Sequence, residues 1–246
     1  MQNFKEGEII LINKPYQWSS FDLVKKIRGL LNKAHTFSYE KGETIPKYKL
    51  KVGRAGTLDP LATGLMIICT GKQTKNIDQL QAQNKEYTGT FFIGATTPSF
   101  DKEHEPDVQY PVDHITKELI YETVKKFIGT TSQVPPVFSA VKVNGKRSYK
   151  TARKGNMDAI PSPREITIYD FQITKIELPL VEFKVTCSKG TYIRSLARDF
   201  GKALNSGAYL EALCRTSVGN YKLENAMEIS DFETLLFKNE TQTLVP

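Results

Sequence analysis

The sequence has little of the chemistry that metal sites and disulfide frameworks require. It contains three cysteines and three histidines in 246 residues. The cysteines, Cys69, Cys187 and Cys214, lie far apart in apolar or mixed segments. Disulfide frameworks and zinc sites need several thiols or imidazoles at short, repeated spacings. We therefore expect neither a disulfide framework nor a bound metal.

Long apolar runs and the common catalytic motifs are also missing. No stretch approaches the about 20 apolar residues that a membrane-spanning helix needs. Residues Met1–Glu8 lack the apolar core of a signal peptide. No glycine-rich loop leads into Lys-Ser or Lys-Thr, and no Gly-x-Ser-x-Gly turn occurs. These absences argue against nucleotide hydrolysis and serine-hydrolase chemistry, and we expect a cytoplasmic protein.

Positive charge is what the chain has in excess. Its formal net charge is +7 and its pI is about 9.1, which indicates a polyanionic partner such as nucleic acid, although a solvated basic surface is the plainer alternative. Tyr149 lies inside the densest group of cations, and an aromatic ring among cations suits a surface that touches both phosphates and bases. That group consists of Lys142, Lys146, Arg147, Lys150, Arg153 and Lys154.

Apolar periodicity predicts a single α+β domain over residues 1–246, with a mixed or antiparallel central sheet flanked by helices. Alternation or short apolar runs predict strands at 8–13, 65–69, 85–94, 138–143, 164–178, 181–187 and 209–218. Helical spacing predicts helices at 19–31, 72–83, 116–128, 148–154, 192–204 and 231–237. Residues 34–50 and 96–111 are predicted loops. The hairpin signals, such as Asn144-Gly145, favour antiparallel pairing.

One stretch, residues 51–71, places a single carboxylate in a tight turn. Pro60 disfavours a helical conformation at Asp59, and the glycines upstream permit sharp backbone geometry. The apolar run after Gly64 predicts a buried strand. An Asp in such a turn often caps its own backbone. It can also serve as a covalent nucleophile or stabilise a developing positive charge, with an arginine beside it favouring the ionised form.

The same stretch resembles the signature of the TruB family of tRNA pseudouridine synthases, in which it carries the catalytic aspartate. The matching residues are Gly56-Thr-Leu-Asp-Pro-Leu-Ala-Thr-Gly64. Further pieces agree in the family's order: Asn13-Lys-Pro15, Lys85-Glu-Tyr87, Ser139-Ala-Val-Lys142 through Gly145-Lys-Arg147, Lys189-Gly-Thr-Tyr-Ile-Arg194 and Leu213-Cys-Arg215. The resemblance spans roughly residues 8–221, and it implies the pseudouridine synthase fold.

The resemblance also implies a role for each matching residue. Asp59 would attack the target uridine, so that the base detaches, rotates and rejoins through carbon. Arg194 would pair with Asp59, and Tyr87 would stack on a uracil extruded from the RNA. Tyr192 and Leu213 would line the uridine pocket, and Lys14 with Pro15 would support the catalytic loop. Lys142 and Arg147 would contact RNA. Such an isomerisation needs no cofactor and no metal.

The resemblance points to tRNA as the partner, through its T-arm stem-loop at the position numbered 55 in tRNA, and to a monomer. Arg54 stands where the family usually has histidine, and a cation there can pair with Asp59 or contact RNA phosphate. Only about two dozen residues follow Tyr221, so we expect no C-terminal RNA-binding domain. Two alternatives are a non-catalytic RNA-binding or RNA-folding protein, and a pseudouridine synthase that acts on ribosomal or other RNA.

Overall fold

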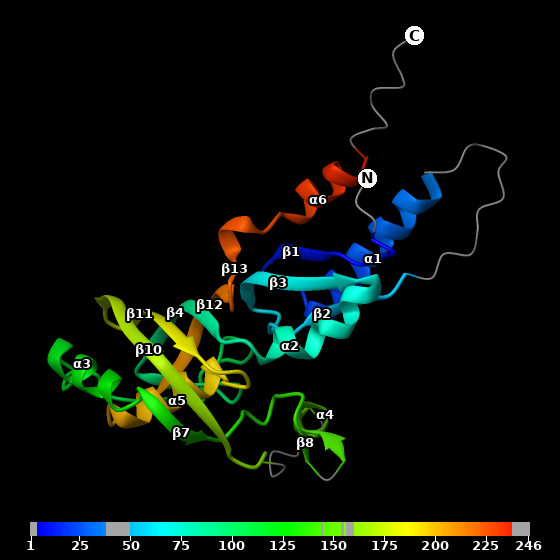
Figure 1. The fold of residues 1–246 in the computed structure, drawn as a ribbon. Coiled ribbons are helices and arrows are strands. Elements are labelled where there is room, and N and C mark those ends of the chain that lie inside the picture. Colours follow the sequence, from blue (N-terminus) through cyan, green and yellow to red (C-terminus); the bar gives the residue numbers. More distant parts are fainter. Residues whose placement is uncertain (1–3, 38–49, 144, 154, 156–159, 238–246) are drawn as a thin grey trace. The chain divides into compact units, whose positions relative to one another are not determined.

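The chain divides into two compact units. The computed structural model describes residues 4–37, 50–143, 145–153, 155 and 160–237 (Figure 1). The first unit comprises Met1–Gln83 and Cys214–Pro246, and the second comprises Asn84–Leu213. Both combine antiparallel strands with helices, as the α+β class predicts. A single domain over 1–246 stays a prediction.

The first unit is built on three antiparallel strands. Its β1 (Ile9–Lys14) and β2 (Val52–Ala55) both pair with β3 (Ala62–Thr70). The register joins Ile9 to Cys69 and Lys14 to Gly64, so the end of β1 lies beside the start of β3. The other elements of this unit are α1 (Ser20–Phe37), the 3-10 helix η1 (Gly71–Asn76), α2 (Ile77–Ala82), β13 (Tyr221–Lys222), the 3-10 helix η2 (Leu223–Asn225) and α6 (Ile229–Phe237).

The first helix begins where the sequence predicts and ends later. The Ser19 hydroxyl accepts a hydrogen bond from the Asp22 amide (3.1 Å), and the Asp22 carboxylate accepts one from the Ser19 amide (3.2 Å), which forms a capping box. Leu23, Ile27 and Leu31 are fully or almost fully buried along its inner face. The helix continues to Phe37, so the prediction of a loop from residue 34 was wrong there. Residues 38–49 of that loop lie outside the described part.

The second unit contains a run of four antiparallel strands and the helices packed against it. Its strands follow the order β4 (Lys85–Ile93), β11 (Leu180–Cys187), β10 (Arg164–Glu177) and β7 (Gly129–Gln133). The helices α3 (Lys117–Lys125), α4 (Ser148–Ala152) and α5 (Ile193–Ala203) complete it, together with the short hairpins β5 (Ala95–Thr96)–β6 (Val108–Gln109) and β8 (Lys142–Val143)–β9 (Lys146–Arg147). The long strand β12 (Ala208–Val218) begins in this unit and ends in the first.

Aromatic rings form the core of the second unit. Phe91 of β4 stacks on Phe183 of β11 with ring centroids 4.1 Å apart, and Phe200 of α5 lies 5.4 Å from Phe91. Phe171 of β10 contacts the same group edge-on. The register of β10 against β11 shifts between Ile168 and Asp170, which is the kind of irregularity that bends a strand.

Three local predictions were wrong because backbone hydrogen bonds override the apolar pattern. The predicted strand 138–143 is a strand only at Lys142–Val143, since the Ser139 amide donates to the Val137 carbonyl in a turn. The predicted helix 72–83 starts as the 3-10 helix η1. The predicted loop 96–111 contains the second strand of the β5–β6 hairpin. Within the described residues, no helix is long and apolar enough to cross a membrane.

Candidate active site

Asp59 opens a tight turn between β2 and β3 of the first unit. The Ala62 amide donates to the Asp59 carbonyl (3.1 Å), and Pro60 takes the second position of this four-residue turn, which its fixed φ favours. Asp59 is half-buried. The turn leads directly into β3, whose residues from Gly64 to Thr70 are all buried. The structure thus confirms the predicted turn and anchors it to a core strand.

Lys14 lies beneath this turn with no exposed surface. Its ammonium donates to the carbonyls of Trp18 (2.6 Å), Pro15 (2.8 Å) and Pro60 (3.2 Å). Burial lowers the pKa of the Lys14 ammonium to about 8, while the nearby charge of Asp59 raises it and that of Arg215 lowers it. Lys14 therefore supports the turn, and it offers no exposed surface to a substrate.

Two further residues, Ser20 and Arg215, hold the turn. Ser20 was not predicted for the site, and Arg215 was named only as part of a matching motif, without a role. The Ser20 hydroxyl donates to the Leu58 carbonyl and accepts from the Leu58 amide, both at 2.8 Å. Arg215 is 1% exposed, and its guanidinium donates to the Leu65 carbonyl (2.8 Å) and reaches the Thr57 carbonyl (3.5 Å). A buried cation normally needs partners to offset its loss of hydration. These backbone oxygens flank Asp59 on both sides, so Arg215 joins the two ends of the turn.

Gly64 is required where β3 passes Arg215. Its φ is +103°, in the region that favours glycine. A Cβ at this position would meet the Arg215 carbonyl oxygen at 2.4 Å and its amide nitrogen at 2.6 Å. The glycine of the motif thus permits the close backbone approach that puts Arg215 against the turn.

Arg54 lies on β2, just before the turn. It is half-buried, and its guanidinium lies 3.4 Å from the Thr57 hydroxyl. The side chain therefore reaches toward the residues that precede Asp59 within the same unit. Its role toward Asp59 or RNA stays a prediction.

Arg194 is buried near the start of α5 in the second unit. It is 5% exposed, and its guanidinium donates to the carbonyls of Ser99 (3.1 Å) and Phe138 (3.0 Å). Its Nε lies 3.4 Å from a carboxylate oxygen of Asp101, which is also almost fully buried. Asp101 lies in a segment predicted only as a loop, and the sequence reasoning missed it. Asp101 is thus a charge partner that holds Arg194 in place, while the pairing of Arg194 with Asp59 stays a prediction.

Tyr87 and Leu213 have different surroundings in the second unit. Tyr87 is 8% exposed on β4, opposite Val185 of β11. Leu213 is half-buried on β12. The ring of Tyr87 thus lies mostly inside the protein, with little surface for a base before substrate binds. Their roles toward a uridine stay predictions.

Tyr192 is fixed from two sides at the start of α5. The buried side chain of Gln133 accepts from the Tyr192 amide (2.8 Å) and donates to the Tyr192 carbonyl (3.1 Å). The Arg164 guanidinium lies over the Tyr192 ring, 5.5 Å from its centroid. Tyr192 itself is half-buried. Gln133 and Arg164 were not among the residues that the sequence reasoning named for the site.

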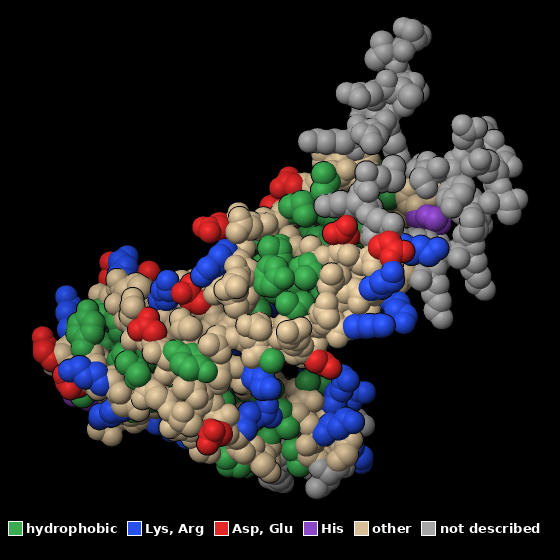
Figure 2. All heavy atoms as spheres, in the orientation of Figure 1, with side chains coloured by type: hydrophobic (Ala, Val, Ile, Leu, Met, Phe, Trp, Pro, Cys, Tyr) green, Lys and Arg blue, Asp and Glu red, His purple; other side chains and the backbone are tan. Residues whose placement is uncertain are grey.

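Lys142 and Arg147 lie opposite each other in the β8–β9 hairpin. Both are exposed, and Figure 2 shows Lys and Arg side chains gathered over β8, β9 and α4. Like charges that face each other across a strand pair are destabilising, and the contact of these two cations with RNA stays a prediction. Lys154 of the predicted cluster lies outside the described residues.

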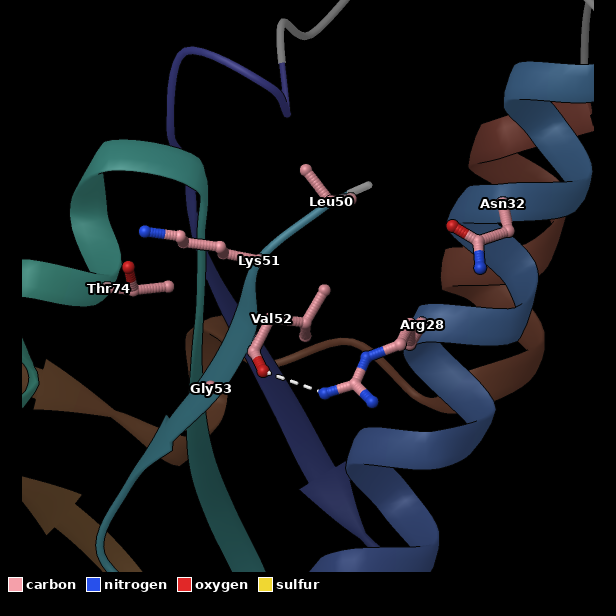
Figure 3. A pocket seen from close by; sticks show the side chains of 7 residues that line it. All are labelled: Arg28, Asn32, Leu50, Lys51, Val52, Gly53 and Thr74. Atoms are coloured by element: carbon pink, nitrogen blue, oxygen red, sulfur yellow. Dashed lines mark hydrogen bonds between the residues drawn. The ribbon is translucent and has the colours of Figure 1, made fainter. Parts of the chain in front are cut away.

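A basic hollow of about 510 Å³ lies at the far end of the β2–β3 hairpin. Arg28, Asn32, Lys51 and Thr74 are among its lining residues, and the Arg28 guanidinium donates to the Val52 carbonyl at 3.0 Å (Figure 3). The nine residues of β3 span roughly 30 Å at about 3.3 Å each. This hollow is therefore remote from the Asp59 turn and does not form a pocket around it. Among the described residues, no three His, Cys, Asp or Glu side chains are grouped to hold a metal ion.

The pKa of Lys14 makes the stability of the fold depend on pH in a specific direction. The pKa falls from 10.5 in the unfolded chain to about 8 when Lys14 is buried, so between these values the unfolded state binds more protons. The free energy of unfolding should then rise with pH from about 8 to 10.5, by no more than about 3 kcal/mol. Denaturant titrations of the wild type and of Lys14→Met across this pH range measure the change in the free energy of unfolding. The Lys14→Met variant should lack this increment, and parallel pH curves for the two proteins would contradict the assignment.

Comparisons with known proteins agree with the motifs. Residues 44–193 match the family described as "TruB family pseudouridylate synthase (N terminal domain)". The chain is 55% identical to the tRNA pseudouridine synthase B of Flavobacterium johnsoniae over 96% of this chain and 98% of that protein. It is 49% identical to the protein of that name from Phocaeicola vulgatus over 99% of each chain.

A solved structure is similar in three dimensions as well. A chain in the crystal structure of a Cbf5-Nop10-Gar1 complex superposes with a TM-score of 0.71 and 25% sequence identity, over 98% of this chain and 58% of that chain. The α+β fold of the pseudouridine synthases, predicted from the motifs, is thereby confirmed. A matching region of this length, together with relatives that are about half identical over their whole length, establishes the assignment: the chain belongs to the TruB family of pseudouridylate synthases.

Proposed function

We propose that this protein isomerises a uridine in the T arm of tRNA to pseudouridine, with Asp59 as the nucleophile. The observation that carries the proposal is the Asp59 turn, which buried Lys14 and Arg215 brace from the inside of the first unit. Bracing of this kind fixes a reactive carboxylate before substrate arrives. The relatives named tRNA pseudouridine synthase B supply the substrate class.

The isomerisation balances within the substrate. The bond between N1 of uracil and C1′ of ribose breaks, the base rotates, and a bond forms between C5 and C1′. The hydrogen on C5 leaves as a proton and N1 gains one, so no oxidant, reductant or group donor is consumed. A carboxylate can form the covalent intermediate that keeps base or sugar bound while the base turns. Asp59 takes this role because it is the acid that the turn presents.

We propose roles for residues of the second unit as well. Arg194, held by Asp101, would pair with Asp59 and keep it ionised, because an opposite charge favours the charged form. Tyr87 would stack on the uracil and assist its proton transfer, and Tyr192 and Leu213 would line the pocket. A base inside a folded RNA loop must be extruded to reach such groups, and aromatic side chains capture it.

The RNA would be gripped chiefly through its phosphates. RNA helices are recognised by shape and backbone, and the exposed cations Lys142 and Arg147 offer two adjacent charges for that purpose. A T-arm stem-loop is small enough for a monomer of this size to hold. We propose that the protein acts in the cytoplasm, on tRNA.

Reversing the charges of the β8–β9 hairpin should weaken RNA binding. In the double variant Lys142→Glu/Arg147→Glu we expect the Kd for a T-arm transcript to rise roughly 10- to 100-fold at low salt. The slope of log K against log salt should fall by about one for each phosphate that the variant no longer binds. Filter binding over a salt series measures both.

Lys117→Glu/Lys125→Glu is the matched control, because these cations are exposed on α3, away from the hairpin. The control should bind nearly as the wild type does. Equal losses of affinity in both double variants would show that only net charge matters.

Release of tritium from RNA labelled at C5 of uridine tests the activity itself. The purified protein should release tritium from a T-arm stem-loop transcript. Binding without release would favour a non-catalytic RNA-binding protein. Release of tritium from ribosomal RNA fragments but not from the stem-loop would favour a pseudouridine synthase that acts on ribosomal or other RNA.

A further inference from the structure

We propose that Gln133 and Arg164 are positioning residues that fix Tyr192 as a stacking surface for the target pyrimidine. The proposal rests on the proposed function, because it takes Tyr192 to line the uridine pocket. Neither residue belongs to the motifs that carry the family resemblance. Both lie in the second unit with Tyr192, so all the contacts that support the proposal lie inside one unit.

Tyr192 stands at the start of α5, where its own side chain does not fix the backbone. It is the N-cap of α5, with φ −97° and ψ 110°, and its side chain makes no capping hydrogen bond. Its carbonyl accepts the first helical hydrogen bond, from the Leu196 amide at 3.0 Å. The four first amides of a helix have no partner within the helix, and a tyrosine ring cannot supply one. Partners outside the helix therefore have to hold the backbone of Tyr192.

Gln133 supplies the missing constraint on the backbone of Tyr192. Its amide side chain makes two hydrogen bonds to the same residue, one to the amide and one to the carbonyl of Tyr192. Gln133 is 3% exposed, so both bonds lie away from water, where an unmade bond is costly. A pair of this geometry leaves the Tyr192 backbone little freedom to rotate.

Arg164 constrains the ring. It is the first residue of β10 and pairs in register with Gln133 of β7, so one cross-strand pair contacts both the backbone and the ring of Tyr192. Its side chain runs beside Gly190, where an added Cβ would lie 3.8 Å from Nη1 and 3.9 Å from Cδ. From there the guanidinium lies over the ring at 5.5 Å. A planar guanidinium stacks on an aromatic face, and an ammonium does so less well.

The arrangement explains why a half-exposed arginine lies on a tyrosine at this point. The cation covers one face of the ring, and a base that stacks on Tyr192 uses the opposite face. A ring fixed in advance loses no orientational freedom when the base arrives, which favours the reactive geometry. The competing interpretation is that Arg164 contacts an RNA phosphate directly, for which only its charge matters.

The variants Arg164→Lys and Arg164→Met separate the two interpretations, because lysine keeps the charge and loses the planar stack. We expect both variants to slow the single-turnover rate on a T-arm transcript roughly 5- to 20-fold, while the Kd stays within about twofold of the wild type. Lys175→Met is the matched control, since Lys175 is an exposed cation on the same strand. It should change neither quantity.

A wild-type rate in Arg164→Lys, with weaker binding and a lower salt slope in Arg164→Met, would overturn the proposal in favour of a phosphate contact. In a Tyr192→Leu background, Arg164→Lys should have no further effect on the rate, because the residue acts through the ring. If the two substitutions lower the rate additively, Arg164 does not act through the ring of Tyr192.

Gln133→Glu adds an independent test, because glutamate keeps the acceptor for the Tyr192 amide but loses the donor to its carbonyl. We expect it to slow single turnover as Arg164→Lys does, with unchanged RNA affinity. A Gln133→Glu variant with the wild-type rate would overturn the role of Gln133. If the wild type converts no uridine at all, the proposed function fails; if it converts uridine and these variants keep its rate, only this inference fails.

Discussion

Asparagine in place of Asp59 is expected to abolish uridine isomerisation while the fold and the RNA affinity remain. The amide has nearly the shape of the carboxylate but is not a nucleophile and carries no charge. Loss of a covalent nucleophile typically lowers the rate by several orders of magnitude. For Asp59→Asn we expect the rate to fall by roughly four orders of magnitude or more. The braces of the turn contact the carbonyls of Thr57, Leu58 and Pro60, so the turn itself should persist.

Single-turnover assays on a T-arm transcript measure the rate, and filter binding and thermal unfolding monitor affinity and fold. Asp78→Asn is the matched control, because Asp78 is an exposed aspartate on α2 of the same unit. It should be as active as the wild type. Residual turnover in Asp59→Asn within about tenfold of the wild type would show that Asp59 is not the nucleophile.

Lysine in place of Arg194 is expected to have the second largest effect. The guanidinium reaches the carbonyls of Ser99 and Phe138 and the carboxylate of Asp101 at the same time. One ammonium cannot satisfy three directions with the planar geometry of a guanidinium. We expect kcat to fall roughly 10²- to 10³-fold, the range seen when a preorganised charge-stabilising group is removed.

Arg198→Lys serves as the matched control for Arg194→Lys. Arg198 lies one turn further along α5, and its guanidinium pairs with the neighbouring Asp199. We expect this control to keep its rate within about threefold. Equal losses in both variants would indicate that α5 as a whole, and not Arg194, is sensitive to the change.

Asp101 offers an independent check on the role of Arg194. Asp101→Asn removes the carboxylate charge beside the almost fully buried Arg194 cation, and breaking a buried ion pair from one side costs about 3–5 kcal/mol of stability. We expect both a lower unfolding free energy and slower catalysis in this variant. Stability that falls while the single-turnover rate stays unchanged would limit Asp101 to a structural role.

Local chemistry explains why parts of the site could be predicted from the sequence. Pro60 and the glycines around Asp59 dictate a turn whatever the rest of the chain does, and Ser19 with Asp22 dictates a helix start. The burial of Lys14 could not be read from the sequence, because residues 9–12 are all apolar and do not show which face of β1 points inward.

The contacts that the sequence did not reveal join residues far apart in the chain. Arg215 binds the Leu65 carbonyl across 150 residues, Arg194 binds the Ser99 carbonyl across 95, and Gln133 binds Tyr192 across 59. Periodicity and turn chemistry describe near neighbours only, so they cannot place such contacts. Asp101 was hidden for a second reason, because a loop aspartate is more often a turn residue than a buried counter-ion.

Nucleotide-resolved mapping of pseudouridine in an unmodified tRNA transcript tests the central claim most directly. The transcript is incubated with the wild type or with Asp59→Asn and then treated with a carbodiimide that marks pseudouridine for reverse transcription. We expect one new stop, at a T-arm uridine, with the wild type and none with Asp59→Asn. A stop outside the T arm, or the same T-arm stop with Asp59→Asn, would contradict the claim.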